Sequence, residues 1–419
     1  MRTLLTAALA TLSGLAAAAE DLVLGFNYPK TGPYAAQGLD QLQAATIAVD
    51  EVNAAGGILG RKVRLAVRDS QSKVDVTKVN VAELIDQEKA AMIFGGSASN
   101  VAITAGAICQ EKGVPFFGTL TYSTETTGEK GRRFVFRECY DSWAAAKVLA
   151  DYMNKNFAGK KFAYITADYT WGHTTEASFR SFTGTDDGAK HRGTKTKFPG
   201  ATEEDFKKAV AFAKLTKPDV LVVVEFGTDM VQCLKLLHEA GLTKTMQVVV
   251  PNLTLGMAEG AGPEAMEGVI GAIPWSRHLA VEKGWKGGTV FADAFAARWN
   301  RWPDTSGASA YTIVHEYKAA AERAGSVEGA AVVKALEGHT YTRLKDAQTW
   351  RAFDHQSIQS VFAVRCKPAA EVRADKFQLD YFATLAELPG DQAFKTHEEW
   401  KAARIKAGMP EALEKLPGE

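Results

Sequence analysis

A turn rich in glycine and serine has the residue types and spacing best suited to chemistry. The strand-like apolar run 90–94 ends at two glycines, the second being Gly96, and Ser97 and Ser99 follow before a helical pattern at Val101. A turn between a strand and a helix directs the unpaired amides of the first helical turn toward a ligand. Either serine can also cap the helix and offer a hydroxyl. The turn predicts a site for a carboxylate or a similar acceptor, although an ordinary strand–helix turn with a serine cap has the same composition.

No arrangement of residues in the chain indicates catalysis. The eight histidines do not form an HExxH pattern, and neither a GxSxG elbow nor a phosphate-binding P-loop occurs. The four cysteines are widely spaced and lack the pairs typical of a zinc site. We therefore expect a binding protein without enzymatic activity, metal or cofactor.

Length and charge narrow the class of protein further. The chain has 419 residues, which is enough for two domains with sizeable cores. Lysine plus arginine and aspartate plus glutamate both number 49, so the formal net charge is zero. This balance gives no reason to expect nucleic acid or an anionic membrane as a partner.

The N-terminus has the pattern of a secretory signal peptide. Arg2 supplies a positive charge, an apolar segment covers residues 4–15, and residues 17–19 are alanines typical of a cleavage site. The apolar segment is shorter than a membrane span. A lipid anchor is not expected either, because no cysteine lies near the cleavage site. We expect residues 1–19 to be removed and the mature protein to be soluble and periplasmic.

Export permits disulfides, and two of the four cysteines are the better candidates. Cys139 and Cys366 each end a short strand-like run, whereas Cys109 and Cys233 fall within apolar helical patterns. We expect Cys139 and Cys366 to form a pair and the other two to be buried thiols.

Short apolar runs alternate with amphipathic helical patterns along most of the chain. The alternation restarts after Tyr140, so that two series of strands and helices follow one another. The main strand-like runs are residues 22–26, 63–67, 90–94, 114–118, 161–166, 220–224 and 247–250. Such alternation is typical of open parallel sheets with loops at the carboxyl ends of the strands. We expect an α/β fold with two doubly wound parallel-sheet lobes and a ligand cleft between facing loops.

Two motifs give the N-terminal half a family resemblance. Thr31-Gly32-Pro33-Tyr34 follows the first strand-like run, and Gly56-Gly57-Ile58-Leu59-Gly60-Arg61 follows the next helical pattern. The Gly/Ser turn and the loop 168–172 occur later in the family's order. Residues 22–365 therefore resemble the periplasmic leucine/isoleucine/valine-type binding proteins of ABC importers. The GGILGR string and its distance from TGP are the specific part of this resemblance.

The resemblance implies a type I periplasmic binding fold, in which two lobes joined by three hinge crossings close on a ligand. It places the crossings near Tyr140, Ile273 and Thr340. The implied segments are residues 20–140 and 274–340 for lobe 1, and residues 141–273 and 341–368 for lobe 2. Residues 369–419 form a C-terminal extension outside the resemblance, and we expect it to pack against a lobe rather than to bind a partner.

The resemblance also implies which residues contact the ligand. The Gly/Ser turn would hold a carboxylate, and loops of both lobes would add aromatic and backbone contacts. The implied ligand-binding residues are Tyr34, Gly96, Ser97, Ser99, Leu120, Thr121, Tyr122, Tyr169, Trp171, Phe226 and Asn252. Of these, Phe226 is equally compatible with a core position because it follows a buried strand.

Asn252 departs from the family pattern. Amino-acid binders of this family usually have an acid there for the ammonium group, whereas an amide supplies no charge. If the ligand is a branched-chain or other apolar amino acid, Glu225 or Asp229 would have to replace that acid. If neither does, the ligand is an amide, a urea-like molecule or an aromatic carboxylate.

The resemblance implies partners as well. The chain would act as a monomeric substrate-binding protein that delivers its small-molecule ligand to the permease and ATPase of an ABC importer. The alternative role is a ligand-sensing receptor component, because the same fold serves in receptors and regulators. A cytoplasmic regulator would lack a signal peptide, and a receptor would carry a membrane span. This sequence has the signal-peptide pattern and no apolar run long enough to span a membrane, so transport is the expected role.

Overall fold

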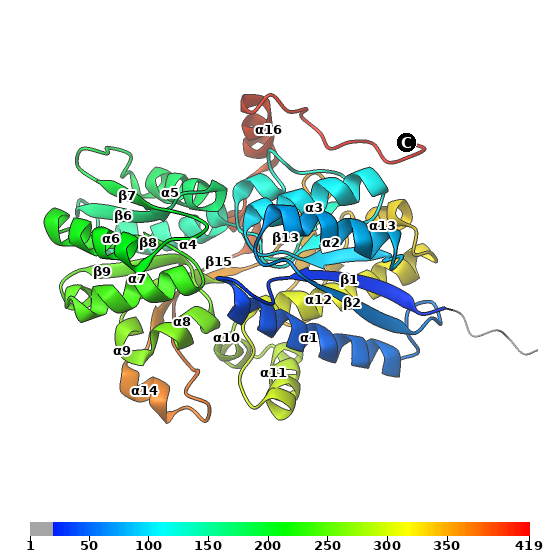
Figure 1. The fold of residues 1–419 in the computed structure, drawn as a ribbon, viewed down its shortest axis with the longest axis horizontal. Coiled ribbons are helices and arrows are strands. Elements are labelled where there is room, and N and C mark those ends of the chain that lie inside the picture. The colour runs from blue at the N-terminus through cyan, green and yellow to red at the C-terminus, as the bar shows by residue number, and fades with distance from the viewer. Residues whose placement is uncertain (1–19) are drawn as a thin grey trace, which may run out of the picture.

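The computed structural model describes residues 20–419, so the predicted signal peptide lies outside the described part of the chain. Two lobes lie side by side, each built around its own sheet with helices packed on it (Figure 1). One sheet has five strands and the other has seven, and a small sheet of three strands accompanies them. The predicted α/β class with two lobes is confirmed.

The sheet of the first lobe is parallel throughout. Its strands are β1 (Leu22–Tyr28), β2 (Val63–Asp69), β3 (Met92–Gly95), β4 (Phe116–Gly118) and β5 (Val135–Arg137). Their order in the sheet is β2-β1-β3-β4-β5, which is that of a doubly wound unit. All seven residues of β1 are buried because helices cover both faces of the sheet.

The helices of the first lobe come from two parts of the chain. Those from its beginning are α1 (Ala35–Ala54), α2 (Val74–Asp86), α3 (Ser99–Lys112) and the 3-10 turn η1 (Thr124–Thr126). Those added later are α10 (Arg277–Glu282), α11 (Lys286–Trp299), α12 (Thr305–Ala324) and α13 (Gly329–Leu336). The helices around the first sheet therefore come from segments that are far apart in the sequence.

The sheet of the second lobe is mixed. Its strands are β6 (Phe162–Ala167), β7 (Gly193–Thr196), β8 (Val220–Val224), β9 (Gln247–Asn252), β10 (Ile270–Ile273), β14 (Val361–Cys366) and β15 (Phe382–Leu388). Their order is β15-β14-β10-β9-β8-β6-β7, and only β14 and β15 run antiparallel to their neighbours. Its helices are α4 (Ser142–Asn156), α5 (Thr170–Thr183), α6 (Glu203–Thr216), α7 (Thr228–Glu239), η2 (Leu242–Lys244), α8 (Leu255–Ala261), α9 (Pro263–Met266) and α14 (Ala369–Ala374).

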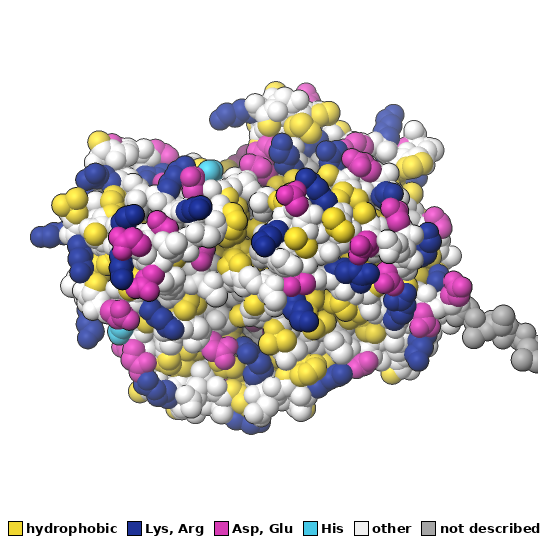
Figure 2. Space-filling model, in the orientation of Figure 1, with side chains coloured by type: hydrophobic (Ala, Val, Ile, Leu, Met, Phe, Trp, Pro, Cys, Tyr) yellow, Lys and Arg dark blue, Asp and Glu magenta, His cyan; other side chains and the backbone are white. Residues whose placement is uncertain are grey.

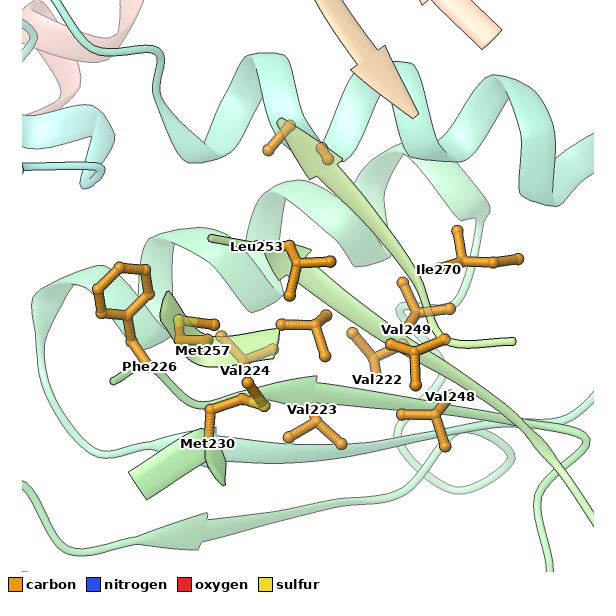
Figure 3. Packing of buried hydrophobic residues seen from close by; sticks show 14 of the residues in the cluster. Val222, Val223, Val224, Phe226, Met230, Val248, Val249, Leu253, Met257 and Ile270 are labelled. Atoms are coloured by element: carbon orange, nitrogen blue, oxygen red, sulfur yellow. The ribbon is translucent and has the colours of Figure 1, made fainter. Parts of the chain in front are cut away.

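The core of the second lobe is centred on β8, whose five residues are all buried. Val222 of β8 lies opposite Val249 of β9, and Val249 lies opposite Ile270 of β10. Figure 3 shows these side chains in a row, with Phe226 at one end beyond Val224. The buried side chains of these strands therefore extend from the lobe interior to the loop that carries Phe226.

A three-stranded sheet precedes the return of the chain to the second lobe. It consists of β11 (Thr340–Tyr341), β12 (Gln348–Trp350) and β13 (Ser357–Ile358). Tyr341 and Trp350 belong to the same hydrophobic cluster as the first-lobe strands. The chain joins the second sheet only at Val361, so the third crossing lies at residues 359–360 rather than near Thr340.

The C-terminal extension contacts both lobes. β15 pairs with β14 in register, so that Leu388 lies opposite Val361 beside the third crossing. The chain then passes through α15 (Gly390–Ala393) to α16 (His397–Lys406), which packs on the first lobe. There Trp400 Nε1 donates to the Thr127 carbonyl at 2.8 Å, and the buried Arg404 donates to the Gly128 carbonyl at 2.8 Å. Figure 1 shows α16 standing apart from the second-lobe strand that precedes it. The extension therefore forms a fourth crossing between the lobes.

The surface carries both signs of charge without a field of one sign on the face that Figure 2 shows. Pairs such as Arg64–Glu88, with an N–O distance of 2.9 Å, are partly exposed and contribute about 0–1 kcal/mol each. Among residues 20–419, no helix has both the length and the apolar character needed to cross a bilayer.

Candidate ligand-binding site

The Gly/Ser turn joins β3 to α3. Gly96 has a φ of 105°, and a Cβ atom there would lie 3.2 Å from the Leu120 carbonyl oxygen, so a side chain at this position would be strained. The residue before the first turn of α3 is Ala98, whose side chain cannot cap the helix. The predicted capping by Ser97 or Ser99 is therefore wrong. Ser99 lies inside the helix instead, and its Oγ accepts a hydrogen bond from the Ser123 amide at 3.0 Å.

The turn retains hydrogen-bond donors. Ser97 is 5% exposed, and its Oγ has no hydrogen-bond partner among the described residues. The amides of Ser99 and Asn100 occupy the first positions of α3, where no helical carbonyl precedes them to accept a bond. The positive end of the helix dipole adds to these donors. The arrangement suits a carboxylate or another anionic acceptor.

The loop after β4 is fixed largely by its own hydrogen bonds. Leu120 and Tyr122 are buried, and the Thr121 hydroxyl lies 2.7 Å from the Thr126 hydroxyl. Of the three loop residues assigned to the site, Thr121 therefore uses its hydroxyl within the loop and offers none to the cleft.

Arg137 holds this loop against the hinge. Its side chain is 1% exposed, and all of its donor nitrogens have partners. Nη1 donates to the carbonyls of Thr121 and Ser123, Nη2 donates to Thr127 Oγ1 and Asp141 Oδ2 at 2.9 Å each, and Nε donates to Gln356 Oε1. Asp141 lies beyond the first crossing and Gln356 precedes the third. One guanidinium thus connects the ligand loop to two hinge crossings. Nothing in the local sequence around Arg137 predicted this role.

Five aromatic side chains assigned to the cleft come together where the lobes meet. The ring of Phe226 lies 5.1 Å from Tyr34, 5.5 Å from Tyr122 and 5.8 Å from Trp171, measured between centroids. Tyr169 joins them because its hydroxyl lies 3.0 Å from the Tyr34 hydroxyl. Tyr34 and Tyr122 belong to the first lobe and the other three to the second. Burial raises the pKa of Tyr34 well above its ordinary value, so both hydroxyls of the pair stay neutral.

Two further aromatic residues complete the cluster and were not predicted. Phe198 stacks on Tyr169 with centroids 4.0 Å apart and faces Tyr34 at 5.9 Å. Tyr140 lies 5.2 Å from Tyr122, and its hydroxyl donates to the Ala272 carbonyl at 2.7 Å. Phe198 follows β7, whose polar sequence Gly-Thr-Lys-Thr has no strand-like apolar pattern.

Direct hydrogen bonds join the facing loops of the two lobes. The Thr228 amide donates to the Pro33 carbonyl at 3.0 Å, and Gln37 Nε2 donates to Thr254 Oγ1 at 3.0 Å. The carboxylate of Asp304, at the start of α12, accepts from the first two amides of α8 at 2.9 Å each. The structure therefore represents a conformation in which the lobes are in contact across the cleft.

Asn252 is oriented by Trp171. The indole Nε1 donates to Asn252 Oδ1 at 3.1 Å, which fixes the oxygen on that side of the amide. The Nδ2 group of this fully buried residue has no partner among the described residues. Asn252 thus has an unpaired NH2 donor, which suits a ligand oxygen, and its own oxygen keeps one free lone pair.

Two acids lie near the aromatic cluster. Glu225 is 1% exposed, and its Oε1 accepts a hydrogen bond from Thr196 Oγ1. Burial raises the pKa of Glu225 to about 8, the Thr196 bond opposes this rise, and the charge of Asp229 adds to it. Burial also raises the pKa of Asp229 to about 6. The negative charges of both carboxylates also raise the pKa of the Tyr34 and Tyr169 hydroxyls.

The predicted disulfide between Cys139 and Cys366 is wrong. All four cysteines are free and buried. Cys139 lies at the first crossing, and its Sγ is 3.5 Å from the Thr121 carbonyl. Cys366 ends β14, five residues beyond Val361 at the hinge, and a strand of that length spans about 16 Å. The two sulfurs are therefore held apart, while Cys109 and Cys233 are buried thiols as expected.

Comparisons with known proteins agree with this fold. A model of the periplasmic binding protein family matches residues 21–371. The Leu/Ile/Val-binding protein BraC3 of Rhizobium johnstonii is 28% identical over 356 residues, covering 80% of this chain and 89% of that protein. The chain therefore belongs to the periplasmic binding protein family. More particularly, its relatives are Leu/Ile/Val-binding proteins, as the sequence resemblance indicated, and these are solute-binding proteins rather than enzymes.

Solved structures show the same fold. A periplasmic binding protein from Burkholderia mallei superimposes with a TM-score of 0.82 at 23% identity, covering 90% of this chain and 97% of that one. A branched-chain amino acid transporter substrate-binding protein from Streptococcus pneumoniae in complex with isoleucine gives 0.73 at 20% identity, covering 87% and 99%. A solute-binding protein from R. palustris in complex with benzoate gives 0.75 at 20% identity, covering 88% and 97%. The type I periplasmic binding fold is thus confirmed.

Proposed function

We propose that this protein is the periplasmic solute-binding component of an ABC importer and that it closes on one small ligand bearing a carboxylate. The observation that carries the proposal is the donor set at the start of α3, set beside an aromatic cluster from both lobes. Ala98, between the two serines, packs in the same hydrophobic cluster as Tyr34, Tyr122 and Trp171. A ligand between these groups would contact both lobes, so binding would favour the closed conformation.

A ligand that carries a carboxylate agrees with what similar proteins bind. One structural neighbour holds isoleucine and another holds benzoate, and both ligands carry a carboxylate. The first candidate ligand is a branched-chain or other apolar amino acid, as the names of the relatives suggest. The second candidate is an aromatic carboxylate or a small amide, and the spare donor of Asn252 favours it.

The proposal also includes the partner proteins, the oligomeric state and the limits of the two lobes. The permease and ATPase of an ABC importer would receive the ligand, and a monomer would suffice because each chain contains both lobes. We propose lobe limits at the crossings near Tyr140 and Ile273 and at residues 359–360. The ligand-binding residues assigned from the resemblance remain predictions, with the Thr121 hydroxyl the weakest of them.

A ligand screen followed by calorimetry tests the proposed function. A thermal-shift panel of amino acids, benzoate and small amides should contain a compound that stabilises the protein, by about 2.7 kcal/mol at 100 times its Kd. Replacing Ser97 by alanine removes a donor from the turn and should weaken that ligand about tenfold, near 1.4 kcal/mol. The control is Ser181→Ala on the exposed surface of α5, which should bind normally. Wild-type affinity in Ser97→Ala would remove the turn from the site.

A further inference from the structure

Lys345 is a buried lysine at the place where the chain passes between the lobes. It lies in the loop between β11 and β12, beside Leu344 of the first-lobe core, and is 4% exposed. Burying an ammonium group is costly unless its donors have partners. Here its three N–H donors face three acceptors, which are the carbonyls of Pro274 and Ser360 at 2.6 Å each and Gln359 Oε1 at 3.3 Å. This match is complete only while the amine is protonated.

Two of these acceptors mark where the chain leaves the second sheet and returns to it. Pro274 follows β10 and Ser360 precedes β14. The two strands are antiparallel neighbours, and Ile273 lies opposite Phe362 at the end of their pairing. The ammonium group of Lys345 therefore joins the second and third crossings just beyond the sheet. A side chain from one lobe thus holds the chain where it enters and leaves the other lobe.

The first crossing is bound to the same region. Gln359 Nε2 donates to the Glu138 carbonyl at 2.5 Å, just after β5. The Tyr140 hydroxyl donates to the Ala272 carbonyl of β10 at 2.7 Å. Three buried side chains therefore join the crossings in pairs, because Tyr140 joins the first to the second, Gln359 the first to the third, and Lys345 the second to the third. Of these three side chains, only that of Lys345 is charged.

We propose that Lys345 is a positioning residue for lobe closure, because its ammonium group fixes the spacing of the second and third crossings. Closure belongs to the proposed function, on which this inference rests, but no particular ligand is required. Without the ammonium group, the buried carbonyls of Pro274 and Ser360 lose a donor, and the two crossings are free to separate. The lobes then sample a wider range of relative orientations.

The protonation of Lys345 gives this role a pH signature. Burial lowers its pKa to about 8, although the charges of three nearby carboxylates oppose this effect. The protonated fraction therefore falls about thirtyfold between pH 7 and pH 9.5. A neutral amine has two N–H donors for three acceptors, so raising the pH should loosen the hinge. The titratable groups that face the ammonium group are Asp346, Glu138, Glu387, Cys139 and Lys283.

Two of these neighbours need separate treatment. The Cys139 thiol stays protonated in this range because burial raises its pKa to about 12. Burial also raises the pKa of Glu138, so this carboxyl is replaced in one variant to separate its titration from that of Lys345. Since the charge of Glu138 raises the pKa of Lys345, Glu138→Gln should shift the response of the hinge to lower pH.

The experiment measures the distance between the lobes without ligand. Nitroxide labels are attached at Gln87→Cys in the first lobe and at Gly188→Cys in the second, since both positions are exposed and the four native cysteines are buried. Pulsed electron resonance gives the distance distribution at pH 7 and pH 9.5, with points between. The proteins are wild type, Lys345→Met, Lys345→Gln, Glu138→Gln and Lys62→Met. Lys62 is an exposed lysine before β2, so its variant makes the same chemical change away from the hinge.

The expected result is a change in the width of this distribution. At pH 7, Lys345→Met should give a distribution about twofold broader than those of wild type and Lys62→Met, because its crossings are no longer joined. Raising the pH should broaden wild type and Lys62→Met with a midpoint near pH 8 and leave Lys345→Met unchanged. Glu138→Gln should keep this response at a lower midpoint.

Several outcomes would overturn the role. They are a Lys345→Met distribution as narrow as that of wild type, a pH response that persists in this variant, and a wild type without a pH response. Circular dichroism shows whether Lys345→Met folds. If it does not, Lys345→Gln keeps two donors without a charge, and a pH response that persists in Lys345→Gln would refute the role. No ligand is present in these measurements, so a negative result leaves the proposed function standing. Failure of every compound in the thermal-shift panel would instead overturn that function and leave the hinge result intact.

Discussion

Replacing Arg137 by lysine tests whether one buried side chain holds the ligand loop in place. Arginine has five N–H donors in a fixed plane, and here they reach Thr121, Ser123, Thr127, Asp141 and Gln356. Lysine keeps the charge but has three donors on one atom, so at least two bonds are lost. A hydrogen bond to a charged group contributes about 1.5–3 kcal/mol, so the free energy of unfolding should fall by about 3 kcal/mol. Ligand affinity should fall about tenfold, because the loop carrying Tyr122 loses its anchor.

Urea denaturation followed by circular dichroism measures the first effect, and calorimetry with the screened ligand measures the second. The control is Arg64→Lys, because Arg64 pairs with Glu88 at the surface and a similar change there should alter stability by less than about 0.5 kcal/mol. An Arg137→Lys protein that is within 1 kcal/mol of wild type would refute the reasoning. Normal ligand affinity together with a large loss of stability would limit Arg137 to a structural role.

Two other changes test the turn and the extension. Gly96→Val should weaken ligand binding more than Ser97→Ala, because the φ of Gly96 is positive and the added Cβ would lie 3.2 Å from the Leu120 carbonyl oxygen. Calorimetry on both variants measures the two affinities, and equal affinities would contradict this prediction. Trp400→Ala removes a buried ring and its bond to Thr127, a loss of about 3–5 kcal/mol, so α16 should detach. Limited proteolysis with mass spectrometry should then cut after Leu388, and continued protection would show that α16 is held by other contacts.

Strands buried on both faces were predictable because they are continuous apolar runs. Val220–Val224 is a strand over the predicted residues. The strands that were missed lie at edges or in the small sheet. Gly193–Thr196 is a polar edge strand, and β15 is recognisable only by its pairing with β14. A polar edge segment adopts the strand conformation because it pairs with a neighbouring strand, and a single sequence does not show which segments pair.

The sequence predicted which loops would carry the candidate site residues better than it predicted the directions of their side chains. Aromatic residues next to glycine or a turn, such as Tyr34 and Tyr169, lie where the lobes meet, and their contact with a ligand stays a prediction. The directions of small hydroxyl side chains were not predictable, because Thr121 bonds to Thr126 within its own loop and Ser99 accepts a bond from the amide of Ser123 in another loop. The bond between Arg137 and Gln356 was beyond reach because these two residues are 219 positions apart in the sequence.

The fourth crossing decides where a reporter of ligand binding can be attached. The described chain begins in the first lobe, where Leu22 starts β1, and the extension brings the C-terminus back to the same lobe, where Glu419 pairs with Arg133 at 3.3 Å. Fluorophores placed at the two termini would therefore move together when the lobes rotate, and their energy transfer would not register closure. A sensitive pair needs one label in the second lobe, for example in the exposed turn at Gly188 between α5 and β7.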